Sequence, residues 1–413
     1  MSIIVQKFGG TSVGTIERIQ AVARRIVSTV QNGHQVVVVV SAMGKSTDVL
    51  VDMAKQITDE PHPREMDMLL TTGEQVSIAL VTMALQKLGQ DAVSMTGWQA
   101  GIMTEEVHMK ARIDHIDAAA VKEALNEGKV VVVAGFQGVS ARGQIMTLGR
   151  GGSDTTAVAL AAALDGAACE IYTDVDGVYT ADPRIVPRAR KLASISHDEM
   201  LELATLGAGV LHPRAVECAK QHRVCVTVRS SFSEEEGTRI EEEANMEQGL
   251  AVSGIAHDKN VAKITVADLP SKVGAMAKLF AVLAQEHINV DVIVQSAYEA
   301  HTGNVSFSVS GDEVKKTLDV LLKHREALQF GYAVAEEDLA KVSIVGAGMI
   351  TNPGVAAQMF TCLAERGIEI KMVSTSEIKV SSIIPLEKME EAVQCLHTSF
   401  GLDVKEAAVV YGG

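Results

Sequence analysis

Short aliphatic, β-branched runs alternate with glycine-rich loops and helical patterns through the first half of the chain. The runs predict buried strands of a mainly parallel sheet at residues 3–5, 36–40, 130–134 and 170–173. Amphipathic or apolar spacing predicts helices at residues 15–30, 74–88 and 154–164, the last opening with the N-cap residues Asp154-Thr155-Thr156. This order predicts an α/β domain whose ligands lie at loop ends and helix N-termini.

Two glycine-rich loops of this domain carry charged residues. The first is Lys7-Phe8-Gly9-Gly10-Thr11-Ser12, and the second is Gly149-Arg150-Gly151-Gly152-Ser153-Asp154. Glycine lets backbone N–H groups close around an oxyanion, because no Cβ is in the way. The lysine and the arginine add positive charge where a phosphoryl group or a carboxylate would sit. Together the loops predict a site for phosphates and a small acidic substrate.

Composition narrows the class of protein. The 413 residues allow about two to three domains. The formal net charge of −15 argues against a nucleic-acid partner. Residues 36–40 form an apolar run too short for a membrane span, and the N-terminus lacks a signal-peptide pattern. Five scattered cysteines without CxxC spacing indicate reduced thiols, so we expect a cytoplasmic protein.

The second half contains an internal repeat. An acidic passage at 233–249 predicts a linker after a first domain at 1–232, although Glu241-Glu242-Glu243 equally suits a solvated helix face. Beyond it, residues 274–284 resemble residues 354–364 at an offset of 80. Each repeat reads as a βαββαβ module, placed at 262–335 and at 250–261 plus 340–413. Single modules leave sheet edges unpaired, so two of them favour side-by-side pairing within or between chains.

Three motifs are interpreted as decoys. Val345-Gly346-Ala347-Gly348 lacks the third glycine of a dinucleotide fingerprint. Gly44-Lys45-Ser46 ends like a P-loop, but Val39 stands where its leading glycine belongs. The histidines, including His212, show no metal-ligand spacing, so no protein-bound metal is predicted.

The two glycine loops, together with the segment Thr173-Asp174-Val175-Asp176-Gly177-Val178-Tyr179-Thr180-Ala181-Asp182-Pro183-Arg184, resemble the signature segments of aspartate kinases. The tandem repeat resembles the two ACT domains that follow the kinase domain in that family. The resemblance implies an amino-acid-kinase fold and ATP-dependent phosphorylation of the β-carboxylate of L-aspartate. That reaction is the first step toward lysine, threonine, methionine and isoleucine. Mg²⁺ would be held mainly through ATP.

The resemblance also implies roles for individual residues. Lys7 would stabilise the transferring charge and Asp174 would help to place the Mg²⁺–nucleotide. The ATP site would comprise Lys7, Gly9, Gly10, Ser41, Thr173, Asp174, Tyr179, Asp182, Pro183 and Arg184. Aspartate would contact Thr47, Glu74, Arg150, Gly151, Gly152, Ser153 and Asp154. Other interpretations stay open: Glu74 also suits a helix N-terminus, Asp154 an N-cap, Pro183 a turn and Arg184 a surface cation.

Feedback amino acids, lysine or threonine or both, would bind at ACT–ACT interfaces of a homo-oligomer or an αβ assembly. The matching positions are Lys272, Val273, Gly274, Asn289, Asp291, Gln295, Asn352, Pro353, Val355, Glu369, Thr375 and Ser376. The chain departs from the family at Gly209, where many members carry an ATP-binding lysine, and at Val273 and Glu369 in the ACT units. Two alternatives are a kinase of another acid, such as acetylglutamate, glutamate or a nucleoside monophosphate, and an amino-acid sensor with a decayed kinase domain.

Overall fold

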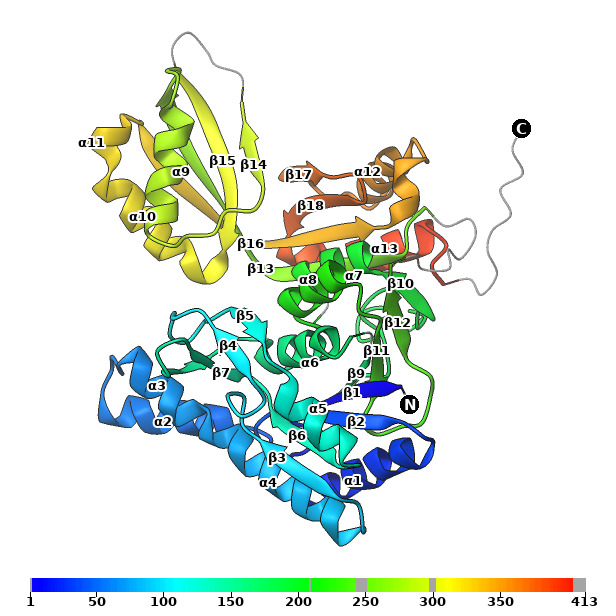
Figure 1. Ribbon diagram of the computed structural model, residues 1–413. Coiled ribbons are helices and arrows are strands. Elements are labelled where there is room, and N and C mark those ends of the chain that lie inside the picture. The colour runs from blue at the N-terminus through cyan, green and yellow to red at the C-terminus, as the bar shows by residue number, and fades with distance from the viewer. Residues whose placement is uncertain (1, 166, 208, 243–250, 297–301, 404–413) are drawn as a thin grey trace. The chain divides into compact units, whose positions relative to one another are not determined.

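The computed structural model describes residues 2–165, 167–207, 209–242, 251–296 and 302–403, which group into two compact units. The first unit holds residues 1–178, 191–205 and 209–246, and the second holds residues 179–190, 206–208 and 247–413. Figure 1 shows the helices and strands of both units, coloured along the chain.

The first unit is built on an eight-stranded sheet in the order β10-β12-β11-β9-β1-β2-β6-β3. Its strands are β1 (Ile3–Phe8), β2 (Gln35–Val40), β3 (Ala92–Met95), β6 (Val130–Ala134), β9 (Ala168–Thr173), β10 (Ser194–Ser196), β11 (Val226–Ser230) and β12 (Thr238–Glu241). The four predicted strands are confirmed as β1, β2, β6 and β9, all parallel to their neighbours in this set. Runs of valine suit such strands because both faces of the sheet are covered.

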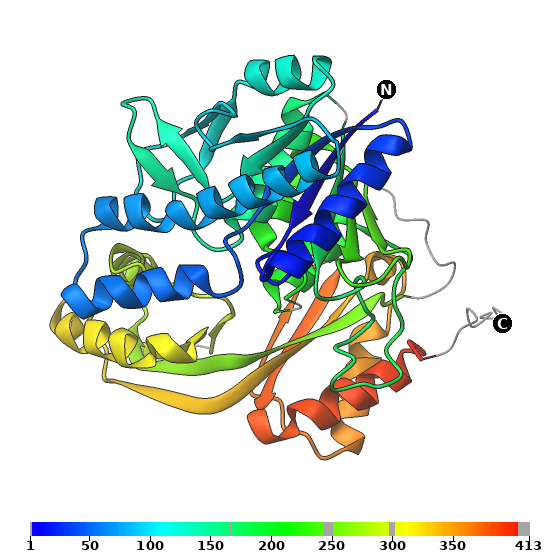
Figure 2. The ribbon, with the colours of Figure 1, turned by 90° about the horizontal axis from the view of Figure 1, so that it is seen from below.

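Helices flank this sheet. They are α1 (Ile16–Gln31), α2 (Ser46–Ile57), α3 (Pro63–Leu70), α4 (Thr72–Lys87), α5 (Ala119–Asn126), α6 (Gly152–Ala163), α7 (His197–Thr205) and α8 (Pro213–His222). The predicted helices correspond to α1, α4 and α6. Figure 2 shows α1 and α4 side by side, and their apolar faces share one core cluster with β1, β2 and β6.

A second, four-stranded sheet in this unit was not predicted from the sequence. It has the order β5-β4-β7-β8, with β4 (Ile102–Thr104), β5 (Ile113–Ile116), β7 (Gln137–Ser140) and β8 (Ile145–Thr147). Its strands are three or four residues long, so they carry little periodic signal. Strand β8 leads directly into the second glycine loop and α6.

The acidic passage predicted as a linker contains a strand. Residues 238–241 form β12, which pairs with β11 antiparallel and with β10 parallel. Thr238 and Ile240 are buried while Arg239 is exposed, the alternation of a half-covered strand. Residues 243–249 of the predicted linker lie outside the described residues, and the domain boundaries stay a prediction.

The second unit is one six-stranded sheet in the order β14-β15-β13-β16-β18-β17. Its elements are β13 (Gly254–Pro270), α9 (Ala275–Gln285), β14 (Ile293–Gln295), β15 (Thr302–Ser310), the short 3₁₀ turn η1 (Gly311–Glu313), α10 (Val314–Lys323), α11 (Arg325–Leu328), β16 (Tyr332–Val345), η2 (Ala347–Ile350), α12 (Val355–Glu365), β17 (Met372–Thr375), β18 (Lys379–Pro385), η3 (Leu386–Lys388) and α13 (Met389–Ser399).

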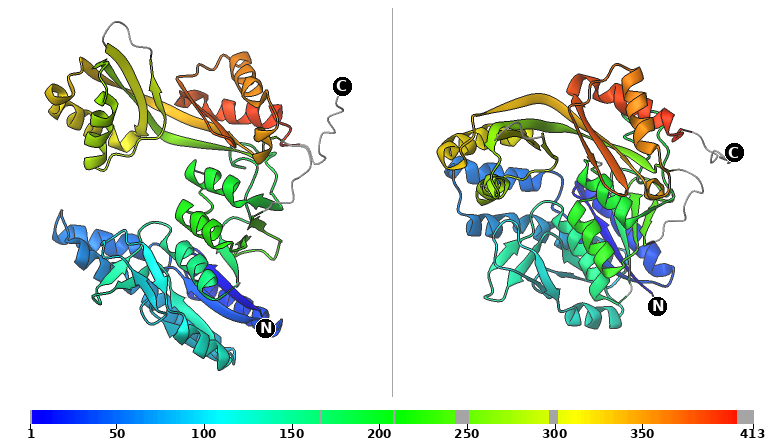
Figure 3. Two further views of the ribbon diagram at one scale, coloured as in Figure 1. Left: turned by 45° about the horizontal axis from the view of Figure 1, so that its top comes forward. Right: turned by 90° about the horizontal axis from the view of Figure 1, so that it is seen from above.

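Two long strands join the repeats. β13 and β16 pair antiparallel from Gly254 opposite Val345 to Ala267 opposite Tyr332, with register shifts between Asp258 and Lys263 (Figure 3). The first part of β13 therefore completes the second repeat, and its last part completes the first. The pairing expected of two modules occurs within the chain. Cores lie under α9 with α10, and under α12 with α13.

One helical stretch, Pro63–Lys87, is long and apolar enough to cross a membrane by length and composition. Half of its apolar window is buried inside the structure, and Ile78, Val81 and Leu85 pack into the core with α1. Packing against the sheet accounts for its apolar residues.

Helix α10 offers a matched test of core packing. Leu321 has no exposed surface, whereas its neighbour Leu322 is 68% exposed. We expect Leu321→Ala to lower the free energy of unfolding by about 2–5 kcal/mol because it leaves a cavity under the sheet. Leu322→Ala should change it by less than about 0.5 kcal/mol. Urea unfolding of both variants measures this, and equal losses would contradict the packing described.

Candidate active site

Four neighbouring parallel strands, β2, β1, β9 and β11, end at the same edge of the eight-stranded sheet. Phe8 lies opposite Val40 and Tyr172, and Thr173 lies opposite Ser230. The loops that follow therefore begin side by side, which brings the predicted Gly9, Gly10, Ser41, Thr173 and Asp174 to one edge. Strand β1 is central. Its neighbour on one side is β2, the next strand along the chain, and its neighbour on the other side is β9, which comes much later in the chain. Ligands of open α/β sheets bind at such a carboxyl edge, where the strand order reverses.

Lys7 and Asp154 form an ion pair at this edge. Lys7 Nζ lies 2.6 Å from Asp154 Oδ1, and the two side chains are 10% and 15% exposed. Lys7 belongs to β1 and Asp154 to the first turn of α6, where the helix dipole favours a carboxylate. The N-cap of α6 is Gly151 with φ 68°, so the prediction of Asp154 as an N-cap is wrong. The carboxylate instead holds the lysine ammonium in place.

The loop after β1 packs directly on the loop after β2. A Cβ on Gly10 would lie 2.8 Å from the Ala42 carbonyl oxygen, and the Gly44 N–H donates to the Gly10 carbonyl at 2.9 Å. Any side chain at position 10 would push these loops apart. The Gly9 N–H donates to the Tyr172 carbonyl at the end of β9, at 3.3 Å. Glycine is therefore required here by close backbone approach.

Glu74 is a buried carboxylate close to this edge. It lies in the first turn of α4, and its Oε1 accepts a hydrogen bond from the Ala42 N–H at 3.1 Å. Its Oε2 has no hydrogen-bond partner among the residues that the structure describes. Desolvation raises the pKa of Glu74 from 4.5 to about 7. A buried carboxylate with one free oxygen suits a cationic ligand group.

The second glycine loop runs from β8 to α6. A Cβ on Gly151 would lie 2.2 Å from His212, so this position accepts only glycine. Arg150 is exposed, and Ser153 is buried against Gly135. The predicted Thr47 lies in the first turn of α2, directly after the loop that contacts Gly10.

Two residues that support this loop were not predicted. Arg214 donates to the backbone carbonyls of Leu148 and Ala111. Asp67 has no exposed surface and accepts from the Thr147 hydroxyl at 2.6 Å and the Met109 N–H at 3.0 Å. Their partners are mostly backbone groups far away in sequence, so no local pattern reveals them.

The remaining predicted nucleotide residues belong to the second unit. They are Tyr179, Asp182, Pro183 and Arg184. The Arg184 guanidinium donates to Asp182 at 2.7 Å and holds the pKa of that carboxyl below its usual range. In the first unit, Asp174 is exposed and accepts from the Thr173 hydroxyl at 3.1 Å. Within the described part of the chain, no three His, Cys, Asp or Glu side chains gather as a metal site.

The predicted effector residues lie at the edge strands of the six-stranded sheet and at the N-termini of α9 and α12. Gln295 ends the edge strand β14, whereas Thr375 ends the opposite edge strand β17. Gly274 and Gly354 are the N-caps of α9 and α12, with φ 91° and 107°. Around them lie Lys272, Val273, Asn289, Asp291, Asn352, Pro353, Val355, Glu369 and Ser376, of which only Val355 is buried.

Two of these residues already take part in ion pairs. Asp291 lies 2.5 Å from the buried Lys341 Nζ. Glu369 lies 3.0 Å from Lys371, which also contacts Glu336 at 2.9 Å. Lys371 holds the pKa of Glu336 below its usual range. An effector ammonium at Glu369 would therefore compete with Lys371.

Comparisons with known proteins agree with this architecture. The profile of the amino acid kinase family matches residues 2–230, and an ACT domain profile matches residues 264–324 and 342–400. An aspartokinase of Bacillus sp. (strain MGA3) is 59% identical over 402 residues, covering 97% of this chain and 98% of the relative. Aspartokinase 2 of Bacillus subtilis is 58% identical over 409 residues, covering 99% and 100%.

Solved structures are similar as well. Aspartokinase III of E. coli, in complex with aspartate and ADP, gives a TM-score of 0.81 at 27% identity, covering 96% of this chain and 99% of that chain. The same protein with lysine and aspartate gives 0.77, again at 27% identity and with the same coverage. The predicted fold class, an amino-acid-kinase fold followed by ACT domains, is confirmed.

The buried Glu74 predicts a pH-dependent stability. Its folded pKa, about 7, lies above the unfolded 4.5, so its favourable contribution is present below pH 4.5 and is lost as the pH rises to about 7. Glutamine cannot ionise, so the ligand-free Glu74→Gln variant should not lose this contribution. The difference in melting temperature, variant minus wild type, should therefore increase from pH 4.5 to about 7 and stay constant above that pH. The exposed Glu60→Gln is the control. A difference in melting temperature between Glu74→Gln and the wild type that stays constant from pH 4.5 to 8 would contradict the raised pKa of Glu74.

Proposed function

The chain belongs to the aspartokinase family and is an aspartate kinase, and we propose that it transfers the γ-phosphoryl group of ATP to the β-carboxylate of L-aspartate at the edge built by Lys7, Asp154 and the glycine loops. One observation carries this assignment: a lysine ammonium fixed by a carboxylate, beside backbone turns that admit only glycine. The enzyme would act in the cytoplasm, at the entry to lysine, threonine, methionine and isoleucine synthesis.

The acceptor chemistry matches what the site provides. A β-carboxylate is ionised at neutral pH, so it attacks phosphorus without a general base. Catalysis then rests on positioning and on neutralising charge at the transferring group. Lys7 supplies a positive charge whose direction is set by Asp154 rather than by solvent.

Aspartate carries one ammonium group and two carboxylates, and the site offers a partner for each sign. Arg150 provides a planar fork for a carboxylate. Thr47 and Ser153, both in first helical turns, provide hydroxyl donors. The unpartnered Oε2 of Glu74 would accept from the ammonium group, whose positive charge would favour the ionised form of that carboxylate. Substrate binding thereby relieves an unfavourable buried group.

The nucleotide site would use Gly9, Gly10, Ser41, Thr173 and Asp174 of the first unit. Mg²⁺, held mainly through ATP, would neutralise phosphate charge when bound. The exposed Asp174 carboxylate at the end of β9 suits such a metal–nucleotide complex. Because Gly209 replaces the lysine of many relatives, Arg184 or Lys220 would supply the missing charge.

Regulation would act through the six-stranded sheet. Its edge strand β14 exposes Ile293 and Val294, at 48% and 41%. An edge strand that carries exposed apolar side chains favours pairing of its outer side with a second copy of the chain. Lysine, threonine or both would then bind beside Asn289 and Gln295 at that interface and favour one arrangement of the assembly.

Replacing each of two lysines tests the catalytic assignment. We expect Lys7→Met to lower kcat at least about 100-fold, because transition-state charge is left unneutralised. The control is Lys45→Met, which removes the exposed lysine of the P-loop-like sequence and should leave kcat within about threefold. Trapping the acyl phosphate with hydroxylamine, with Mg²⁺–ATP and aspartate, measures both. Full activity of Lys7→Met, or no hydroxamate from the wild type, would refute the assignment.

Effector binding is tested on the same assay with lysine, threonine and both. We expect one of these additions to inhibit, and Asn289→Ala to raise the concentration for half-inhibition at least about tenfold by removing an amide hydrogen-bonding group from the site. Gln285→Ala, at the exposed end of α9, is the control. The same half-inhibition in both variants and the wild type would exclude Asn289 from the effector site.

A further inference from the structure

A polar groove lies on the sheet face opposite Lys7. Successive side chains of a strand point to opposite faces, so Gln6 and its neighbour Lys7 diverge. Lys7 meets Asp154 of α6, whereas Gln6 donates to Thr29 of α1 at 3.0 Å and to Glu170 of β9 at 2.8 Å. The groove therefore uses a different face from the proposed active site.

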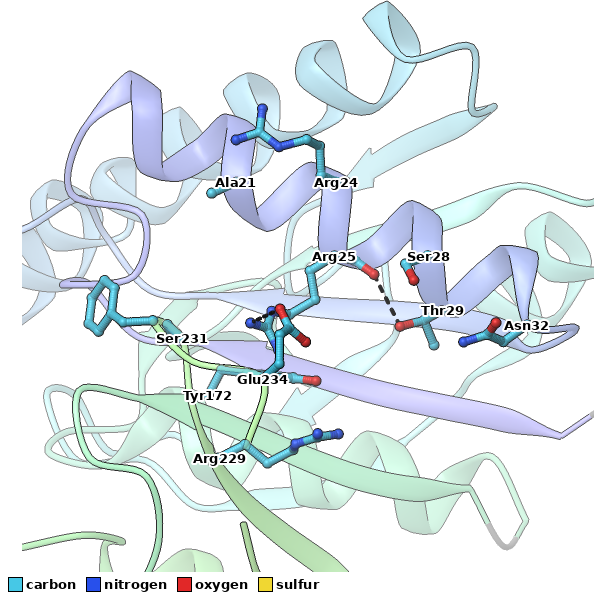
Figure 4. Close-up of a pocket in the computed structure, with 11 residues that line it drawn as sticks. Ala21, Arg24, Arg25, Ser28, Thr29, Asn32, Tyr172, Arg229, Ser231 and Glu234 are labelled. Carbon is cyan, nitrogen blue, oxygen red and sulfur yellow. Dashed lines mark hydrogen bonds and ion pairs between the residues drawn. The ribbon is translucent and has the colours of Figure 1, made fainter. Parts of the chain in front are cut away.

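The groove is formed between α1, the neighbouring strands β9 and β11, and the segment that follows β11. It encloses about 740 Å³. Figure 4 shows Ser28, Thr29 and Asn32 of α1 on one side, and Tyr172 with Arg229 on the other. Arg25, Ser231, Phe232 and Glu234 complete the wall, together with Ala21 and Arg24. The lining contains three arginines and one glutamate, in a chain whose net charge is −15.

Two of the arginines are held rigidly. The guanidinium carbons of Arg25 and Arg229 lie 5.0 and 6.0 Å from the centroid of the Tyr172 ring, which itself stacks on Phe8 at 4.7 Å. Cations over aromatic rings are held by the ring's negative face. Arg25 is only 14% exposed and Arg229 25%. Little conformational entropy remains to be lost when an anion binds them.

The bonds of these arginines leave capacity for a ligand. Arg229 pairs with Glu170 at 3.3 Å, while its Nε is buried without a hydrogen-bond partner in the described ranges. Arg25 donates to the Ser233 carbonyl at 2.9 Å and to the Glu234 carboxylate at 2.8 Å. Glu234 is 87% exposed, so solvent competes with this ion pair and it holds weakly. Its carboxylate occupies the place where an external anion would sit.

We propose that this groove binds a small ligand with two anionic groups, which replaces the Glu234 carboxylate on Arg25 and bridges to Arg229. Guanidinium forks match both phosphate and carboxylate oxygens. The hydroxyls of Ser28 and Thr29 and the amide of Asn32 supply further polar groups around the same space. The inference uses none of the residues assigned to catalysis, so it stands or falls separately from the proposed function.

Isothermal titration of the full chain with pyrophosphate tests the site. Lys7→Met weakens phosphate binding at the proposed active site, and the arginine variants then identify which part of the remaining heat comes from the groove. In that background we expect Arg25→Gln and Arg229→Gln to weaken binding at least tenfold and Glu234→Gln to tighten it at least threefold. Arg142→Gln, which removes an 80% exposed arginine elsewhere, is the charge control and should leave the affinity unchanged.

Either of two results would overturn the proposal. One is an affinity in Arg25→Gln and Arg229→Gln equal to that in Arg142→Gln. The other is the absence of saturable heat in Glu234→Gln, whose exposed side chain can be changed without disturbing the fold. A parallel titration with malonate separates the two sources of anion: tighter pyrophosphate binding indicates a phosphate ligand, and tighter malonate binding a dicarboxylate.

Discussion

Strand β1 is the element on which the first unit depends. It is central, largely buried and parallel to both neighbours. Its side chains therefore pack on both faces of the sheet, and its end contributes to the active-site edge. Gln6 organises polar contacts on the α1 face, and Lys7 reaches the α6 face. At its end, the Ser12 hydroxyl of the following loop contacts the Ser231 hydroxyl at 2.5 Å. Ser231 lines the polar groove, so the wall of that groove contacts the first glycine loop of the active site.

The active-site edge places charge where water is scarce. Lys7 and Asp154 satisfy each other, which limits the penalty of burying both. Glu74 is left with one unpaired oxygen and a raised pKa, an arrangement unfavourable for stability without ligand. Such residues are expected at functional sites, because the missing partner is the substrate group that the site binds. Aspartate would supply that group.

The second unit solves a different problem, the unpaired edges of small βαββαβ modules. β13 and β16 extend through both repeats, so each strand belongs to two cores. Two edges remain, β14 and β17, and they carry the predicted effector residues Gln295 and Thr375. The shared sheet therefore connects the two repeats through continuous backbone pairing.

The sequence by itself determined the elements whose pattern is local. Valine runs specify β2 and β6, glycine-rich segments mark the two loops, and the offset of 80 residues between Gly274 and Gly354 identifies the repeat. Tertiary structure alone decided the pairing of Lys7 with Asp154, the strand β12 inside the acidic passage, and the anchoring of the second glycine loop by Asp67 and Arg214. These contacts join residues far apart in the chain, often through backbone groups that every residue shares. Periodicity and composition record which face of an element is buried, and they carry no record of what lies against it.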